Sequence, residues 1–289
     1  MNGESYILTC RCPDRVGVVA AVTSFFASFD GWIVEAAQHA DRETGLFFMR
    51  QEVLADSVPF GVGELRRRFA AVAEGLDMTW TLRDPATPHR VMLLGTKAEH
   101  CLADLLQRWS TGDLRFELCG VISNHGHLRR LTEYHGVPYH EVPIAPGGDL
   151  NDKAAGFAEV RRLCDEAEAE TLVLARYMQV LPPEFCAAYD GRVINIHHSF
   201  LPSFAGAKPY HQAHERGVKL IGATCHYVTA ELDAGPIIEQ DVIRVTHAHD
   251  PAELARRGRD VERLVLTQGV RYHLEDRVMR YGNKTVVFV

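Results

Sequence analysis

The stretch Val91-Met-Leu-Leu-Gly95 has no polar side chain. A strand that is apolar along its whole length is buried on both faces, which is typical of a parallel sheet covered by helices. Further short strands are expected at 118–123, 171–174 and 193–196, and segments with helical spacing separate them. This alternation predicts an α/β fold with a Rossmann-like, mainly parallel sheet.

The residues before Asp84 follow a different pattern. They predict strand, helix, strand, strand, helix and strand, over 6–10, 16–29, 32–40, 46–53, 60–74 and 78–82. This βαββαβ order is that of a ferredoxin-like sandwich. Because Asp84–Arg90 contains two prolines and separates the two patterns, we expect a first domain at 1–84, a linker at 85–90 and a second domain at 91–289.

Composition argues against a nucleic-acid or membrane partner. The 289 residues are 46% hydrophobic and 24% charged, which is enough apolar material for a full core. The net charge is −7 and no block of Lys and Arg occurs, so we expect no nucleic-acid partner. The first residues do not look like a signal peptide, and no apolar run is as long as a membrane span. We therefore expect a cytoplasmic protein.

A candidate site lies where the last expected parallel strand ends, in Asn195-Ile-His197-His198-Ser-Phe-Leu-Pro202. Asn195 and His197 are two residues apart, so they point to the same face of a strand. Polar side chains at the end of a buried strand are costly unless they are bonded. Ligands bind at the carboxyl ends of such strands, which makes this segment a candidate site.

A carboxylate can complete this site. Asp233-Ala-Gly-Pro236 follows His197 by 36 positions. The amide of Asn195 can hold a developing oxyanion, His197 can donate a proton, and Asp233 can accept one from a nucleophile. This set suits acyl or formyl transfer without a covalent intermediate. Each residue alone would be an ordinary strand end or turn, and spacing does not show that Asp233 reaches His197.

Histidines and cysteines offer a weaker alternative, a metal site. Five histidines fall within thirty residues: His197, His198, His211, His214 and His226. His211 and His214 are three apart on an expected helix and can share a face, but no HExxH motif occurs. The seven cysteines are scattered without a CxxC pair, so free thiols are expected. We expect no metal.

At these residues the chain resembles the formyltransferases that use 10-formyltetrahydrofolate. The resemblance covers about 88–289 and rests on Asn195–Pro202, Gly222-Ala-Thr-Cys-His226-Tyr-Val228 and Asp233-Ala-Gly-Pro-Ile-Ile238. It implies that Asn195, His197 and Asp233 are catalytic and that His226 assists them. It also places the folate pterin against two loops and implies no cofactor beyond the folate substrate. The residues concerned are Arg176, Tyr177, Met178, Gln179, Val180, Leu181, Val228 and Leu232. Met178 and Leu181 could equally be core residues.

The first domain resembles an ACT domain through Cys12-Pro-Asp-Arg-Val-Gly17-Val-Val-Ala20. An ACT domain ahead of this formyltransferase-like domain resembles the formyltetrahydrofolate deformylase family. That resemblance implies hydrolysis of 10-formyltetrahydrofolate to tetrahydrofolate and formate. It further implies that the formate supplies purine synthesis and that the reaction balances the one-carbon folate pool. It also implies a homo-oligomer, a dimer or tetramer. Two roles of the first domain are left open. It binds an amino-acid effector near Asp14–Gly17 or Gly31, or it is purely structural and forms dimers.

Three other functions share parts of this pattern. A glycinamide ribonucleotide formyltransferase needs a phosphate-binding turn, whereas Gly95–Cys101 here contains Glu99 in place of small residues, with Lys97 as a partial offset. A methionyl-tRNA formyltransferase carries a basic C-terminal domain, and this chain is acidic overall. A binding protein without activity would not need Asn195, His197 and Asp233 together. We therefore expect water as the formyl acceptor.

Overall fold

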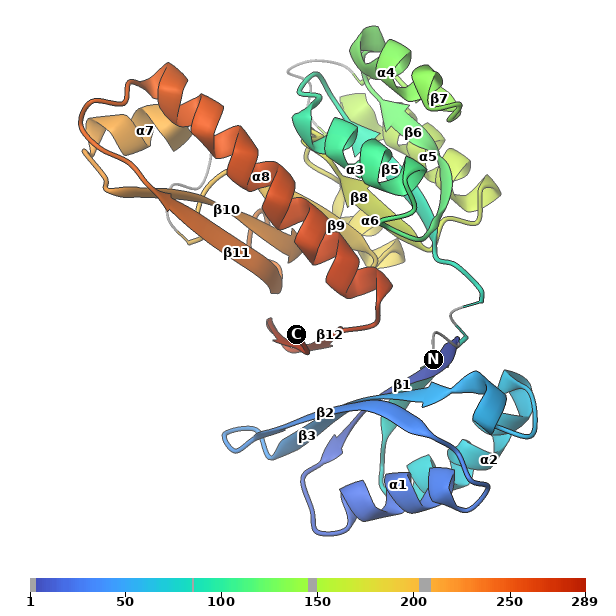
Figure 1. The fold of residues 1–289 in the computed structure, drawn as a ribbon. Coiled ribbons are helices and arrows are strands. Elements are labelled where there is room, and N and C mark those ends of the chain that lie inside the picture. Colours follow the sequence, from blue (N-terminus) through green and yellow to red (C-terminus); the bar gives the residue numbers. More distant parts are fainter. Residues whose placement is uncertain (1–3, 85, 145–149, 203–208) are drawn as a thin grey trace. The chain divides into compact units, whose positions relative to one another are not determined.

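The computed structural model describes residues 4–84, 86–144, 150–202 and 209–289. The chain folds into two compact units. The first comprises Met1–Pro88 with Glu275–Tyr281 and Val286–Val289, and the second comprises His89–Leu274 with Gly282–Thr285. Figure 1 shows both units along the chain.

The first unit is built on a four-stranded antiparallel sheet in the order β2-β3-β1-β4. Its elements follow the expected βαββαβ order, with a short 3-10 turn, η1, before the second helix: β1 (Ser5–Pro13), α1 (Val18–Ala27), β2 (Ile33–Asp41), β3 (Leu46–Leu54), η1 (Ala55–Ser57), α2 (Val62–Gly75) and β4 (Thr79–Arg83). Both helices lie on one face of the sheet (Figure 1). Phe26 and Phe69 from these helices pack against Leu8 and Met49 from the strands and form the core.

The C-terminal segment covers the opposite face of this sheet. Phe48 and Arg50 alternate with the core residues Phe47 and Met49 along β3, so they point away from the helices. Phe48 packs against Val286 and Phe288. The last two strands, β12 (Val278–Tyr281) and β13 (Lys284–Val287), pair with each other.

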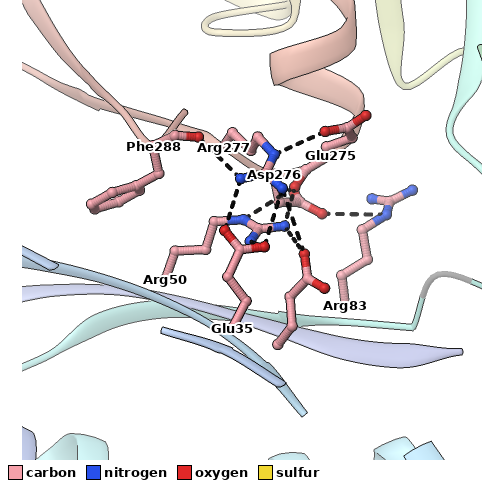
Figure 2. Close-up of polar contacts among 8 residues, drawn as sticks. Glu35, Arg50, Arg83, Glu275, Asp276, Arg277 and Phe288 are labelled. Carbon is pink, nitrogen blue, oxygen red and sulfur yellow. Dashed lines mark hydrogen bonds and ion pairs between the residues drawn. The ribbon is translucent and has the colours of Figure 1, made fainter. Parts of the chain in front are cut away.

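Arg50 fixes this segment to the sheet. Its side chain is 1% exposed and lies 2.5 Å from Glu52 Oε1 and 3.3 Å from Glu35 Oε2. It also donates a hydrogen bond of 2.9 Å to the main-chain carbonyl of Glu275 (Figure 2). The expected second domain runs to Val289, whereas the structure groups most of the residues after Leu274 with the first unit. The buried cation and the apolar cluster around Phe48 account for this difference.

The second unit contains a seven-stranded sheet in the order β11-β10-β9-β8-β5-β6-β7. The five strands from β9 to β7 pair in parallel, while β10 is antiparallel to both of its neighbours. The predicted mainly parallel α/β sheet is therefore confirmed. Its strands are β5 (Arg90–Gly95), β6 (Glu117–Ser123), β7 (Tyr139–Glu141), β8 (Thr171–Leu174), β9 (Val193–His197), β10 (Leu220–Tyr227) and β11 (Ile237–Arg244).

Helices connect and cover these strands (Figure 1). Their bounds are α3 (His100–Ser110), η2 (Gly126–Leu128), α4 (Arg129–Tyr134), α5 (Leu150–Glu166), α6 (Pro183–Ala188), α7 (Pro209–Glu215) and α8 (Pro251–Leu274). None of the described helices is long and apolar enough to span a bilayer. Because β5, β8 and β9 are parallel neighbours, their carboxyl ends meet at one edge of the sheet. Leu174 at the end of β8 pairs with Asn195 on β9, which places the following loop beside Asn195.

Candidate active site

Asn195 and His226 face each other across two antiparallel strands. They are register partners on β9 and β10, and Asn195 Nδ2 lies 3.2 Å from His226 Nε2. His226 Nδ1 lies 2.9 Å from the carbonyl oxygen of Tyr227, so Nδ1 carries the proton and Nε2 accepts one from the amide. Burial lowers the pKa of His226, which keeps the ring neutral and preserves this arrangement. Among the described residues, the second amide hydrogen of Asn195 has no partner, so it can donate to an oxygen of a ligand.

His197 and Asp233 form a buried pair at the same strand end. His197 Nδ1 lies 3.2 Å from Asp233 Oδ2, and the two side chains are 6% and 13% exposed. The hydrogen bond with His197 lowers the pKa of Asp233 and outweighs the opposite effect of burial. His197 Nε2 has no hydrogen-bond partner among the described residues. One ring nitrogen is therefore oriented by a carboxylate, while the other is available for chemistry.

The turn after β10 carries Asp233 to this pair. Asp233 has φ 55°, a left-handed conformation that Asp tolerates better than most residues. A Cβ on Gly235 would lie 1.8 Å from the carbonyl oxygen of Tyr227, so only glycine fits there. The amide of Tyr227 donates a 2.9 Å hydrogen bond to the carbonyl of Pro236. The Asp-Ala-Gly-Pro sequence thus folds back onto β10, and the strand β11, which the sequence pattern did not predict, follows it.

A cavity of about 340 Å³ opens beside these four side chains. All eight residues for which the family resemblance implies folate binding line it: Arg176, Tyr177, Met178, Gln179, Val180, Leu181, Val228 and Leu232. Thr229, Ala230 and Glu231, which lie within the second expected loop between Val228 and Leu232, also line it. The loop after β8 is held in place because the amide of Met178 donates a 3.0 Å hydrogen bond to Thr96 Oγ1.

The residues that line the cavity differ in how far their side chains are exposed. This difference distinguishes residues at the rim of the cavity from residues of the hydrophobic core. Met178, Val180 and Leu232 are 57%, 50% and 63% exposed, so apolar side chains stand uncovered around the cavity. Tyr177 and Leu181 are only 4% and 6% exposed and belong to the core beneath the sheet edge. Of the two residues left open from sequence, Met178 is therefore a rim residue and Leu181 is a core residue that also forms part of the wall.

His198 lies beside the site but does not join the polar pairs. Its ring centroid is 5.4 Å from that of His197 and 6.0 Å from that of Tyr210. Burial, reinforced by the charge of Arg176, lowers the pKa of His198 to about 4. His211 and His214 are exposed on α7. Among the described residues, the group whose atoms converge as potential metal ligands is His100, Cys101 and Glu262, and it contains neither of them.

A second cavity, of about 750 Å³, borders the turn that follows β5. Charges of both signs line it. The cations are Lys97, Arg256, Arg259 and Arg263, and the acids are Glu99, Asp104 and Asp260. Arg256 is bound to Glu253 and Arg263 to Asp260, so part of the positive charge is compensated. The expected acid at the start of α3, Glu99, is present at the cavity wall.

The chain is similar in sequence and fold to several known proteins. The formyl transferase family model matches residues 89–270. A formyltetrahydrofolate deformylase from Corynebacterium sp. is 47% identical, over 98% of this chain and 97% of that protein. The solved structure of a formyltetrahydrofolate deformylase from Pseudomonas syringae is 54% identical with a TM-score of 0.97, covering 100% of this chain and 96% of that one. A phosphoribosylglycinamide formyltransferase from Anaplasma phagocytophilum is 30% identical with a TM-score of 0.62, covering 70% and 96%.

Proposed function

This chain belongs to the formyltetrahydrofolate deformylase family, and we propose that it hydrolyses 10-formyltetrahydrofolate to tetrahydrofolate and formate. The observation that carries this proposal is the buried His197–Asp233 pair beside the Asn195 amide, at the wall of the 340 Å³ cavity. The pair supplies a base and an acid within one site, and the amide supplies a neutral donor. Those are the groups that addition of water to a formyl carbon requires.

In this mechanism each polar group acts on a named atom. Asp233, ionised because its pKa is lowered, accepts a proton from the attacking water. The free amide hydrogen of Asn195 stabilises the negative charge that develops on the formyl oxygen. The proton taken from the water passes from Asp233 to His197, which donates a proton from Nε2 to N10 of the folate as the carbon–nitrogen bond breaks, so the pair ends as it began. His226 orients the Asn195 amide through the 3.2 Å contact rather than touching the substrate.

The folate ring system is proposed to lie in the loop after β8. Met178, Val180 and Leu232 offer uncovered apolar surface to a flat ring, and main-chain groups of the same loop offer hydrogen bonds. A ligand that covers these apolar side chains removes their surface from water, which favours binding. No cofactor beyond the folate and no metal enters this mechanism.

An amine could replace water as the acceptor, as in the phosphoribosylglycinamide formyltransferases that share the fold. The second cavity contains cations that could face a phosphate, but Glu99 lies at the turn where an anion would approach α3. A formate-release assay with 10-formyltetrahydrofolate, with and without glycinamide ribonucleotide, tests the choice. We expect formate in both cases at similar rates. A strict need for the amine would overturn hydrolysis.

We further propose that the first unit is an ACT domain that pairs with a second copy and binds a small amino acid. Its βαββαβ order and the left-handed Gly17, with φ 96° at the start of α1, support this assignment. Formate from the second unit would supply purine synthesis and balance the one-carbon pool. Sedimentation gives the oligomeric state, and the melting temperature measured with each amino acid tests the effector. A monomer with no response would remove the proposal.

A further inference from the structure

A buried carboxylate on α8 is not used by the proposed reaction. Glu262 is 1% exposed, although it lies on a helix whose other acids, such as Asp260, face solvent. The hydroxyl of Tyr210 donates a 2.6 Å hydrogen bond to Glu262 Oε1, and His100 Nε2 donates one of 2.9 Å to Oε2. Arg176 Nε lies 3.3 Å from the same Oε2. Burial would raise the pKa of Glu262, but these partners outweigh it and lower the pKa.

This carboxylate joins three segments that are distant in sequence. His100 begins α3, Arg176 follows β8 with a left-handed φ of 63°, and Tyr210 lies on α7. The fit is close, because a Cβ on Gly258, one helical turn before Glu262, would lie 1.9 Å from the Tyr210 hydroxyl. Leaving a buried charge unpaired is costly, so each of the three partners is held to the carboxylate. The cluster is therefore a fixed structural element at the carboxyl edge of the sheet.

The same cluster includes one residue from the wall of each cavity. Arg176 lines the cavity that contains His197 and Asp233, while His100 lines the 750 Å³ cavity. Both side chains contact one oxygen of Glu262, which lines neither cavity itself, so these three residues connect the wall of one cavity to the wall of the other. We propose that Glu262 determines acceptor specificity by keeping this wall closed. An amine that enters the second cavity then cannot reach the formyl carbon, and water remains the acceptor.

This inference rests on the proposed deformylase function and goes beyond it. If the wall opens, the nitrogen of a small amine attacks the formyl carbon and the bond from that carbon to N10 breaks. N10 gains a proton and the amine loses one, so the products are a formamide and tetrahydrofolate. The ratio of formamide to formate therefore reports the state of the wall, whereas total turnover does not.

The test uses glycinamide as the amine, with N-formylglycinamide measured by mass spectrometry and formate measured enzymatically. Glu262→Ala removes the side chain that holds the wall, and we expect the ratio of N-formylglycinamide to formate to rise by about tenfold or more over the wild type. Glu262→Gln keeps the volume and a hydrogen-bond partner for Tyr210, so its ratio should return toward the wild-type value. A structural defect alone would lower both products and leave the ratio unchanged.

Two further variants keep the test decisive. His100→Ala opens the wall from the second cavity and should raise the ratio even if Glu262→Ala does not fold. Leu264→Ala changes an exposed side chain of the same helix, 51% exposed, that lines neither cavity, and should not change the ratio. An unchanged ratio in His100→Ala and in folded Glu262→Ala would overturn the inference, and so would an equal rise in Leu264→Ala. Absence of formate from the wild type without amine would instead overturn the proposed function.

Discussion

Gly235 lies so close to Tyr227 that a Cβ at position 235 would stand 1.8 Å from the Tyr227 carbonyl oxygen. This close approach lets the turn after β10 fold back onto the strand. As a result, Asp233 Oδ2 lies 3.2 Å from His197 Nδ1. The glycine is not among the residues that line the cavity, so it acts on the site through the geometry of the turn.

Replacing Gly235 by alanine should separate Asp233 from His197. The added methyl group cannot fit, so the turn must move away from Tyr227 and carry Asp233 with it. Misplacement of a catalytic group by about 1 Å typically costs about 100-fold in rate, and we expect a loss of at least that order in formate release. Gly63→Ala is a matched control because nothing lies within 4 Å of its Cβ, and it should keep full activity. Wild-type turnover in Gly235→Ala would contradict this account.

Sequence alone locates Asn195 and His197 because strand periodicity has only two faces. Their shared face and their place at a strand end follow from the apolar residues before them. The distance between His197 and Asp233 does not follow from sequence, since it depends on the turn at Gly235 and on the antiparallel pairing of β10. The Asn195–His226 contact depends on the same pairing, which a pattern of parallel strands does not reveal.

The C-terminal segment shows a second limit of sequence patterns. An antiparallel sheet with one solvated face should show polar residues at alternate positions, yet Phe47-Phe48-Met49 in β3 is apolar throughout. That run signals that both faces are covered, but it does not say by what. The cover is a segment more than two hundred positions later in the sequence, and Arg50 reaches it. The local alternation of apolar and polar residues along a strand does not reveal long-range contacts of this kind.

Removing Arg50 should destabilise the first unit strongly. Arg50→Ala leaves Glu52 and the carbonyl of Glu275 without their buried cation, and breaking a buried pair typically costs about 3–5 kcal/mol. Arg67→Ala is the control, because that side chain is 78% exposed and its pair with Glu64 should contribute no more than about 1 kcal/mol. Urea denaturation of the two variants measures the difference. Equal unfolding free energies would show that the Arg50 network does not hold the C-terminal segment.

His198 should make stability depend on pH in a defined direction. Its pKa is lowered to about 4 in the folded chain, against about 6.5 when unfolded, so the unfolded chain binds the proton first. Its contribution to stability is full above about pH 6.5 and is lost as the pH falls toward about 4. His198→Gln should flatten the fall in urea midpoint over this range, whereas His211→Gln, at an exposed position, should not. If the urea midpoint of His198→Gln fell with decreasing pH as steeply as that of the wild type, His198 would be excluded as the group responsible.

Asp233→Asn tests the role of the carboxylate with little change of shape. Asn tolerates the left-handed backbone at φ 55°, so the turn should keep its conformation. The amide cannot accept a proton from water, and loss of a general base typically lowers the rate by about 10²–10⁴. We expect a fall of that size in the turnover number for formate, measured well below the melting temperature, because loss of the buried pair with His197 also lowers stability. Asp241→Asn, on the exposed part of β11, should keep wild-type turnover. If Asp233→Asn also turned over at the wild-type rate, the proton would have to leave by another group.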